Sequence, residues 1–305
     1  MKIAVIGEPL VELSLSDEQG DKLQRRPGGD SLNMAIYLSR LLDKGQHQLS
    51  YFTRLGDDAS SRWLTAALTA EGISTDHIGI EAGGQPGLCQ IENLAGGERR
   101  FSYWRSDSPA RRMFVDGNSP RTTAFSGFDM LIFSAVTLAI LQPAAREDML
   151  QQVAGLAGSG TAVVFDTNYR PALWHSPQIA RHWVERASHL ATLLMPTTDD
   201  LRPLYDISSP TDLFRMLSDQ YRCDIVLKDG GQPVQTRIKG IAGTFTLDCS
   251  GPRIDTTGAG DSFNAGFVAA RIAGQSPEDS VTAAHQLASI VVAHRNAVIP
   301  ISAMP

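Results

Sequence analysis

Short apolar runs rich in β-branched residues alternate along the chain with longer runs in which apolar residues recur every three or four positions. The first pattern is typical of buried strands and the second of amphipathic helices. Strands are predicted at residues 2–7, 49–56, 130–135, 161–168, 191–196 and 224–230. Helices are predicted at residues 31–43, 59–71, 142–157, 177–189, 211–219, 260–273 and 277–295. The alternation predicts an α/β fold with a mostly parallel central sheet between layers of helices.

Two stretches, residues 10–27 and 86–106, instead alternate apolar and polar residues, with hairpin-type turns at 18–20 and 95–97. A period of two indicates antiparallel strands with one face in water. We expect these strands to form a small sheet that lies over the main domain as a lid. Surface hairpins without a functional role are the alternative.

The composition is that of a globular protein, with 42% hydrophobic and 20% charged residues over 305 positions. No internal repeat and no linker rich in Pro, Gly or Ser divides the chain. One domain is therefore expected over residues 1–305, with lid strands within about 10–27 and 86–115. The net charge of -6 argues against nucleic acid or an anionic membrane as the main partner.

The three cysteines, at 89, 223 and 249, have no C-x-x-C spacing, so neither a disulfide framework nor a zinc site is indicated. The first residues, MKIAVIGEPLVEL, contain too short an apolar run for a signal peptide. No segment approaches the roughly 18 apolar residues that a membrane span requires. We expect a soluble protein of the reducing cytoplasm.

The stretch DTTGAGDSF, residues 255–263, places a glycine-rich turn at the entrance of a predicted helix. Gly258 and Gly260 permit a tight turn whose backbone N–H groups, with the positive end of the helix, suit a developing negative charge. Asp261 in the first helical turn is then placed to accept a proton from an attacking hydroxyl. The alternative is that Asp261 only caps the helix. The stretch is neither a Walker A loop nor a dinucleotide fingerprint.

A second glycine pair, Gly28 and Gly29, precedes another predicted helix. The pair allows a ligand to approach the backbone closely, and Asn33 in the first turn can hydrogen-bond hydroxyl groups. The alternative is a helix capped by Asp30 or Ser31. Each of these two predicted helices follows a glycine-containing turn, and the two lie near opposite ends of the chain. Together the two motifs favour a functional role more strongly than either motif does alone.

Together, GG-x-x-x-N at 28–33 and DT-x-GAGD at 255–261 resemble the paired signature of the ribokinase-like (PfkB) carbohydrate kinases. The resemblance covers essentially the whole chain. It implies a three-layer α/β/α sandwich with a small β-sheet lid, and ATP-dependent phosphorylation of a sugar. It also implies that Asp261 is the catalytic base and that an anion hole is formed by the amides of Gly258, Ala259 and Gly260.

Finer features are similar to one subgroup, the 2-keto-3-deoxygluconate kinases. These are GEPLVELS at the first strand, RRFSYWRSDSPA at 99–110, FDTNYRPALW at 165–174 and RNAVIPISAMP at the end of the chain. A keto sugar acid carries a carboxylate, and its pocket requires a fixed cation, preferably an arginine. Five arginines lie within residues 98–112.

Arg105 and Arg170 are our candidates for contacts with the carboxylate and the keto-hydroxyl end of the sugar. For Arg170 the alternative is an ion pair at a strand end. For the other arginines of the segment a solvated surface is expected: Arg99, Arg100, Arg111 and Arg112. Tyr103 and Trp104 alternate on the lid strand, so one of them faces the substrate, and the resemblance favours Tyr103. The substrate-binding residues are then Gly28, Gly29, Asn33, Tyr103, Arg105, Arg170 and Asp261.

On the nucleotide side, the resemblance implies an ATP site near the VLKDGG stretch and the late helix. Its residues are Lys228, Gly230, Thr256, Gly258, Gly260 and Ala288. The N-x-x-E element of the family is replaced here, with Thr197 in place of Asn and Asp200 in place of Glu. Magnesium usually keeps several waters, so Asp200 is expected to hold Mg²⁺ through water. A helix capped by Thr197 or Thr198 is the alternative.

Many relatives hold a monovalent cation through backbone carbonyls that match Asp255 and Thr257, which implies a possible K⁺ site. Asn296 stands where a glycine is expected in the adjoining loop, so this site stays open. The resemblance also implies a homodimer through the lids. Another PfkB kinase, acting on fructose, ribose or a nucleoside, and a non-catalytic sugar-acid sensor are the alternative functions. A Rossmann-type oxidoreductase is disfavoured because no G-x-G-x-x-G follows the first strand.

Overall fold

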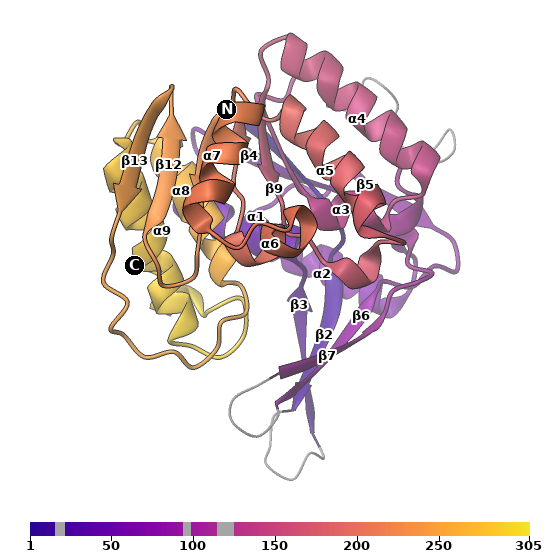
Figure 1. Ribbon diagram of the computed structural model, residues 1–305. Coiled ribbons are helices and arrows are strands. Elements are labelled where there is room, and N and C mark those ends of the chain that lie inside the picture. Colours follow the sequence, from indigo (N-terminus) through magenta and orange to yellow (C-terminus); the bar gives the residue numbers. More distant parts are fainter. Residues whose placement is uncertain (16–21, 94–98, 115–124) are drawn as a thin grey trace.

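The computed structural model describes residues 1–15, 22–93, 99–114 and 125–305. A central sheet of nine strands runs through the molecule (Figure 1). Its order is β13 (Ile241–Phe245), β12 (Val234–Ile238), β11 (Asp224–Leu227), β10 (Leu193–Leu194), β9 (Ala162–Asp166), β8 (Met130–Ser134), β1 (Lys2–Ile6), β4 (Gln48–Gly56) and β5 (Ile78–Glu81). All pairs from β11 to β5 are parallel, and β12 and β13 add an antiparallel hairpin at one edge.

Helices cover both faces of this sheet and make the three predicted layers. One face carries α3 (Ala135–Ile140), α4 (Pro143–Gly158), α5 (Pro177–Leu190), α6 (Thr198–Tyr205) and α7 (Pro210–Gln220). The other carries α1 (Asp30–Leu41), α8 (Ala259–Ile272) and α9 (Pro277–Val292). Along β1, Ala4 and Ile6 belong to the first core and Ile3 and Val5 to the second. Burial on both faces explains why these strands are apolar throughout.

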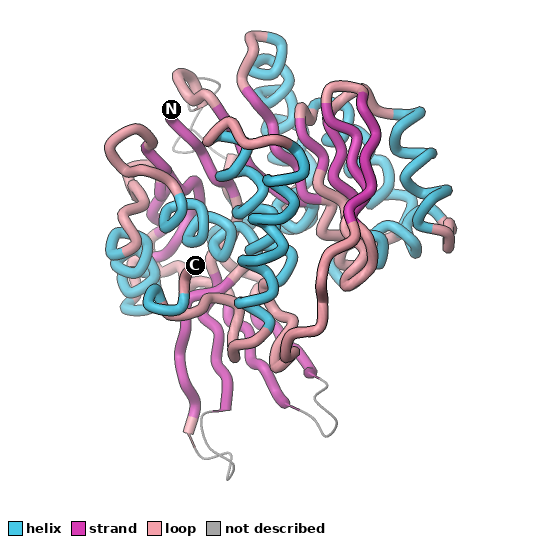
Figure 2. Tube along the Cα trace, turned by 90° about the vertical axis from the view of Figure 1, so that its left-hand side faces the viewer, coloured by secondary structure: helices cyan, strands magenta, loops and turns pink. Residues whose placement is uncertain are grey.

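A separate four-stranded sheet, which we call the lid sheet, extends from the main body (Figures 1 and 2). Its order is β3 (Leu23–Gly28), β2 (Leu10–Leu15), β6 (Leu88–Asn93) and β7 (Arg99–Trp104). β2 pairs with β3 and β6 with β7 in antiparallel fashion, but β2 pairs with β6 in parallel. The expectation of a purely antiparallel sheet was therefore wrong, because two hairpins join through strands that run in the same direction. The turns predicted at 18–20 and 95–97 lie outside the described residues.

The base of the lid sheet packs on α2 (Ala59–Ala70). Val11 and Leu88 share an apolar cluster with Leu64 of this helix. Arg25 adds a cation–π contact, with its guanidinium carbon 4.1 Å from the centre of the Trp63 ring. One face of the lid sheet is thus attached to the body, and the opposite face is directed away from α2.

The predicted strands and helices are present, and the elements that the pattern missed are short or edge elements. These are β5, β12, β13, α3 and α6. The β12–β13 hairpin turns at Lys239 and Gly240, both with positive φ, as a two-residue hairpin turn requires. α6 contains Pro203, which obscured its helical pattern. The described part of the chain also contains the short 3₁₀ helices η2 (Pro109–Arg112), η3 (Pro171–Leu173) and η4 (Ile301–Ala303).

The order of the strands determines where a ligand can bind. The chain leaves β1 for β4 on one side, and all later parallel strands from β8 to β11 are added on the other side. Ligands of open α/β sheets bind at the carboxyl edge beside such a reversal. Glu8, Ser134, Asp166 and Lys228 end or follow strands at this edge. Among the described helices, none has the length and apolar character that crossing a bilayer demands.

Candidate active site

The two glycine motifs meet at Asp261, although they lie at opposite ends of the chain. Asn33 Nδ2 donates a hydrogen bond of 2.8 Å to Asp261 Oδ2, and α1 packs directly against α8. Gly258 precedes α8 with φ 78, and a Cβ there would lie 2.6 Å from the carbonyl oxygen of Ala297. A Cβ at Gly260 would meet only open space. Glycine is therefore required at 258 for the turn, and at 260 it leaves room beside Asp261.

The Asp261 carboxyl group lies close to other acids at the carboxyl edge of the sheet. Burial raises its pKa from 3.8 to about 8, and the negative charges of Asp30 and Asp166 act in the same direction. The Asn33 hydrogen bond and the charge of Lys228 oppose the increase. A carboxyl group with a pKa near the working pH is well suited to take and return a proton.

Asp30 links α1 to two strand ends. Its Oδ2 accepts hydrogen bonds from Ser134 Oγ at 2.5 Å and from Asn168 Nδ2 at 2.8 Å. Ser31 Oγ pairs with the Tyr51 hydroxyl at 2.8 Å. Neither Asp30 nor Ser31 therefore caps α1, whose N-cap is Gly29 with φ 115. The helix-cap alternative for this motif was wrong, because both side chains are used in tertiary contacts.

Lys228 and Asn264 bind Asp166 at the end of β9. Lys228 Nζ donates to Asn264 Oδ1 at 2.7 Å, and Asn264 Nδ2 donates to Asp166 Oδ2 at 2.8 Å. Lys228 Nζ also lies 3.8 Å from Asp166 Oδ1. The lysine that sequence reasoning assigned to the nucleotide is buried and is partly neutralised by Asp166. Sequence reasoning did not assign Asp30, Asp166, Asn168 or Asn264 to the site. For Asp166 and Asn168, polar residues at the end of an apolar strand were a usable signal.

Arg170 and Asp200 form an ion pair on the other side of this cluster. Arg170 Nη1 lies 2.6 Å from Asp200 Oδ1, and the side chains are 53% and 15% exposed. Burial raises the pKa of Asp200, while the charge of Arg170 lowers it and that of Asp166 raises it. The ion pair that was the alternative for Arg170 is present. Thr197 occupies the N-cap position of α6 but makes no side-chain cap hydrogen bond, and Thr198 Oγ1 donates to the Lys228 carbonyl.

Arg105 is fixed by a buried glutamate at the end of β1. Its Nε and Nη2 both donate to Glu8 Oε2, the former at 2.8 Å, and Ser108 Oγ donates to Glu8 Oε1. The Glu8 side chain is only 1% exposed. Arg105 also lies close to Tyr103, with its guanidinium carbon 5.7 Å from the centre of the tyrosine ring.

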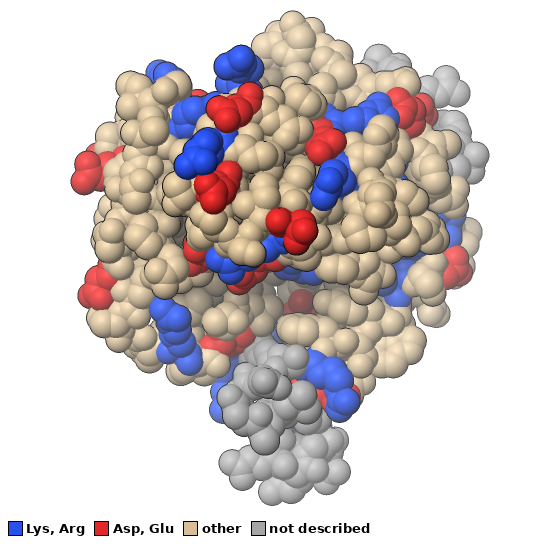
Figure 3. Space-filling model, in the orientation of Figure 1, with Lys and Arg blue, Asp and Glu red and all other residues tan. Residues whose placement is uncertain are grey.

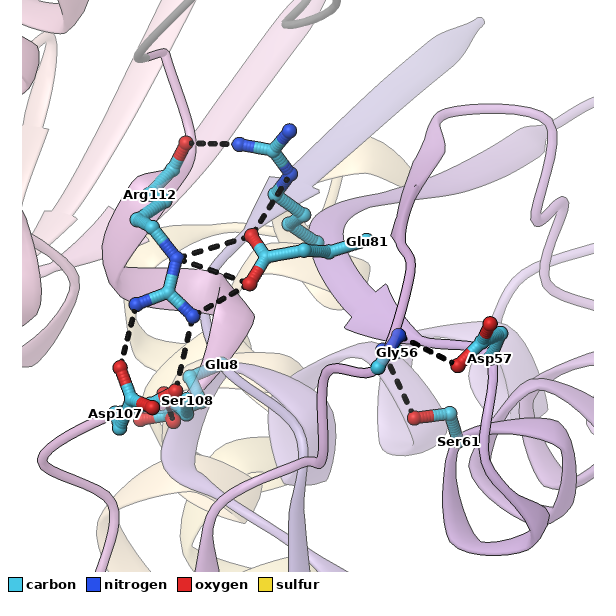
Figure 4. A network of polar contacts seen from close by, with 10 residues as sticks. Glu8, Gly56, Asp57, Ser61, Glu81, Asp107, Ser108 and Arg112 are labelled. Carbon is cyan, nitrogen blue, oxygen red and sulfur yellow. Dashed lines mark hydrogen bonds and ion pairs between the residues drawn. The ribbon is translucent and has the colours of Figure 1, made fainter.

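Two of the arginines expected on a solvated surface, Arg100 and Arg112, have acidic partners. Figure 4 shows Arg112 between Glu81 and Asp107, with Ser108 and Glu8 close by. Arg112 Nη2 donates to Glu81 Oε1 at 2.6 Å. Arg100 pairs with Glu92 across β6 and β7 and remains 64% exposed. The prediction of a solvated surface was thus correct for Arg100. It was wrong for Arg112, which connects the loop after β7 to β5 through Glu81.

The remaining predicted residues surround this cluster. Gly28 and Gly29 join the lid sheet to α1, and Cβ atoms there would overlap the Glu12 side chain and the Glu8 carbonyl oxygen. Thr256 and Ala259 lie in the turn before α8 and at its start. Gly230 has φ 57 in the turn after β11, and Ala288 is half-buried on α9. Within the described residues, these last two lie outside the hydrogen-bonded cluster.

Asp255 organises the turn before α8. Its Oδ1 accepts from the Thr257 amide at 2.9 Å and its Oδ2 from the Asn296 amide at 2.5 Å. Asn296 has φ 77, the left-handed conformation that asparagine tolerates better than most residues. Asn296 therefore adopts the conformation that a glycine would adopt most easily at this position.

The residues at the carboxyl edge fit a magnesium ion held mainly by phosphates and water. Among the described residues, no group of three or more His, Cys, Asp or Glu side chains could hold a metal ion. Asp166 and Asp200 repel each other, which favours a cation between them. Magnesium is commonly bound by one or two carboxylates together with substrate phosphates. In Figure 3 the surface between the main body and the lid sheet is hollowed, with acidic and basic residues close together.

Comparison with known proteins identifies the family of the chain. The family model described as "pfkB family carbohydrate kinase" matches residues 1–304. The chain belongs to this family. The predicted family and the predicted α/β fold with a small separate sheet are thereby confirmed.

Relatives and solved structures extend over the whole of this pfkB chain. It is 34% identical to the 2-dehydro-3-deoxygluconokinase of Escherichia coli (strain K12), covering 100% of this chain and 99% of the relative. The enzyme of the same name from Haemophilus influenzae is 33% identical, with 98% and 95% covered. The 2-dehydro-3-deoxygluconokinase structure from Thermotoga maritima has a TM-score of 0.82 at 19% identity, with 99% and 98% covered.

Another solved structure, the aminoimidazole riboside kinase of Salmonella enterica complexed with aminoimidazole riboside and an ATP analog, also has a TM-score of 0.82. Its sequence identity is 20%, with 100% of this chain and 96% of that chain covered. Members of this fold therefore bind sugar-like substrates with different chemical groups. The residues of the individual site, rather than the fold, must determine the substrate of this pfkB protein.

The stability of the ligand-free Asp261→Asn variant, compared with that of the wild type, should increase as the pH rises. The folded-state pKa of about 8 lies above the usual 3.8, so between these values the folded protein binds more protons than the unfolded chain. Stability from this group is therefore greatest at low pH and is lost as the pH rises through 8. Asn cannot ionise, so the melting temperature of Asp261→Asn minus that of the wild type should increase by at least about 2 °C from pH 5 to pH 9.

Differential scanning fluorimetry at pH 5, 7 and 9 measures this difference. Asp199→Asn removes an exposed carboxylate and serves as the control, with a side chain that is 77% exposed. A difference for Asp261→Asn that is the same at all three pH values would show that the carboxyl group titrates normally.

Proposed function

We propose that the protein is an ATP-dependent kinase that phosphorylates 2-keto-3-deoxy-D-gluconate to 2-keto-3-deoxy-6-phosphogluconate. The observation that carries the proposal is the contact between Asn33 and Asp261 at the start of α8, beside two arginines suited to an acid. Relatives named 2-dehydro-3-deoxygluconokinase, 33–34% identical over nearly the full chain, support the choice of substrate.

In the proposed reaction, Asp261 takes the proton from the hydroxyl on carbon 6 of the sugar acid. The oxygen attacks the γ-phosphorus of ATP, a new P–O bond forms, and the bond to the bridging oxygen of ADP breaks. The amides of Gly258, Ala259 and Gly260, at the positive end of α8, stabilise the charge on the transferred group. Asp200 would hold a magnesium ion through water, and this ion would neutralise phosphate charge.

For the sugar acid, Arg170 provides the cation for the carboxylate. Arg105 and Tyr103 contact the oxygen atoms of the sugar from the lid sheet, and Asn33 orients the hydroxyl that reacts. Gly28 and Gly29 allow the sugar to approach the backbone where the lid sheet meets α1. The hollow between the main body and the lid sheet is called the recess below. The lid sheet would exclude water from it, because ATP hydrolysis otherwise competes.

For ATP, the proposed contacts lie in the turn before α8, in the turn after β11 and on α9. They are Lys228, Gly230, Thr256, Gly258, Gly260 and Ala288. A K⁺ ion bound by the backbone carbonyls of Asp255 and Thr257 is proposed to support the anion hole. We place the reaction in the cytoplasm, where ATP is available and the three cysteines can stay free, as they are here.

A coupled assay of ADP release with ATP and magnesium tests the proposed function. The sugars are 2-keto-3-deoxygluconate, its galacto epimer, fructose, ribose and a nucleoside. The keto-deoxy acid should have the highest kcat/KM, and Asp261→Asn should lower kcat by about 10²–10⁴-fold, the range of a general base, while ATP still binds.

A neutral sugar with the highest kcat/KM would assign the protein to another pfkB activity. Absence of ADP release with every sugar would favour a non-catalytic sensor. More than about a tenth of the wild-type activity in Asp261→Asn would exclude its role as the base.

A homodimer through the lid sheet is the proposed assembly. Large apolar side chains are exposed on this sheet, among them Leu23 at 49%, Phe101 at 40% and Trp104 at 58%. Exposed apolar groups gathered on one element are typical of a protein interface. Light scattering with size-exclusion chromatography should therefore give twice the chain mass of 33.0 kDa, and Phe101→Glu should shift it toward the monomer.

The matched control is Ile241→Glu, which places the same charge at a 75% exposed residue on the edge strand β13. This control should remain a dimer. A wild-type protein that elutes as a monomer at all concentrations, or a loss of the dimer only in the control, would contradict the lid interface.

A further inference from the structure

The basic side chains that the structure brings to the recess all have acidic partners. Lys228 faces Asp166, Arg105 binds Glu8, and Arg170 binds Asp200. A carboxylate ligand needs a cation, and a cation that is already paired attracts an anion only after it exchanges partners. The carboxylate of the sugar acid in the proposed function would therefore compete with one of these acidic partners when it binds.

Arg105 is poorly placed for such an exchange. Its side chain is 10% exposed and that of Glu8 is 1% exposed. Two of its nitrogens donate to one Glu8 oxygen, and Ser108 satisfies the other oxygen. Separating this pair would leave a charged carboxylate buried without a counter-charge, which is strongly unfavourable.

Arg170 has the properties that an exchange requires. Its guanidinium group is half exposed and meets Asp200 through a single nitrogen, Nη1. The backbone beside it is fixed, because Pro171 follows and the neighbouring Tyr169 and Trp174 are buried. The guanidinium group can therefore turn from Asp200 to a ligand while the loop keeps its position.

The Asp200 side chain is less able to turn toward solvent than the Arg170 side chain. Its side chain is 15% exposed, and the negative Asp166 lies within its electrostatic reach. When Arg170 leaves, Asp200 becomes a largely buried carboxylate that lacks its closest counter-charge. A divalent cation that arrives with the nucleotide would remove this penalty.

We infer that Arg170 exchanges Asp200 for the carboxylate of the sugar acid, and that the released Asp200 makes the sugar acid and the magnesium nucleotide bind cooperatively. The inference rests on the proposed function and adds to it a coupling residue. Each ligand then improves the binding of the other by the same factor, because coupling between two sites is reciprocal. The sugar acid alone binds weakly, since it must break the ion pair without compensation.

Isothermal titration calorimetry of 2-keto-3-deoxygluconate tests the inference in the absence and presence of saturating Mg·ADP, with which no phosphoryl transfer occurs. The wild type should bind the sugar acid about 5–50-fold more tightly with Mg·ADP, within the usual range of such coupling. Asp200→Asn keeps the shape of the side chain but not its charge. It should bind the sugar acid alone at least about 5-fold more tightly than the wild type and gain less than about 2-fold from Mg·ADP.

Asp199→Asn is the matched control, because it removes one negative charge from the neighbouring position of α6 and breaks an exposed pair with Arg202. It should behave like the wild type. The reverse titration, Mg·ADP into the wild type with and without sugar acid, must give the same coupling factor. Melting curves verify that each variant is folded.

Equal coupling factors in the wild type and Asp200→Asn, or weaker binding of the sugar acid alone by Asp200→Asn, would overturn the inference and leave the proposed function intact. Coupling lost equally in Asp199→Asn would also overturn it. A wild-type protein that neither binds nor phosphorylates the sugar acid would instead overturn the proposed function, and the inference with it.

Discussion

The burial of one carboxyl group, that of Asp261, places a constraint on much of the surrounding structure. An ionised carboxylate is costly away from water, and two further acids, Asp30 and Asp166, lie close enough to add repulsion. The fold tolerates the group because each of these acids has hydrogen-bond donors of its own, from Asn33, Asn264 and the strand ends. The same burial raises the pKa of Asp261 to about 8, the range that the proposed proton transfer requires.

Close packing of helices keeps this group in position. α8 packs against both α1 and α9, and a Cβ at Gly266 would lie 2.9 Å from the Ala284 backbone. The parallel sheet then brings strand ends from distant parts of the chain to the same edge. The site is therefore assembled from segments that the sequence separates by more than 200 residues, as the 228-residue separation of Asn33 and Asp261 illustrates.

The central sheet, the two helix layers and both glycine motifs were predictable because each has a local signature. The strands are apolar throughout, and the left-handed turn at Gly258 requires a residue without a side chain. The parallel pairing of β2 with β6 was not predictable, since period-two patterns do not distinguish strand directions. Nor were the partners of Arg105 and Arg170, because Glu8 and Asp200 are 97 and 30 residues away and only the fold brings them near.

The paired arginines change the way in which an acid would be recognised. Sequence reasoning treated the arginine-rich segment as a source of positive charge, but the net charge is -6 and basic and acidic groups are interspersed on the surface seen in Figure 3. A long-range field would therefore contribute little to capturing an anion. Recognition would depend on a local exchange of partners, in which the ligand carboxylate must replace that of Asp200 on Arg170. A neutral sugar has no charge that could replace that of Asp200 on Arg170, so the ion pair would favour an acid over a neutral sugar.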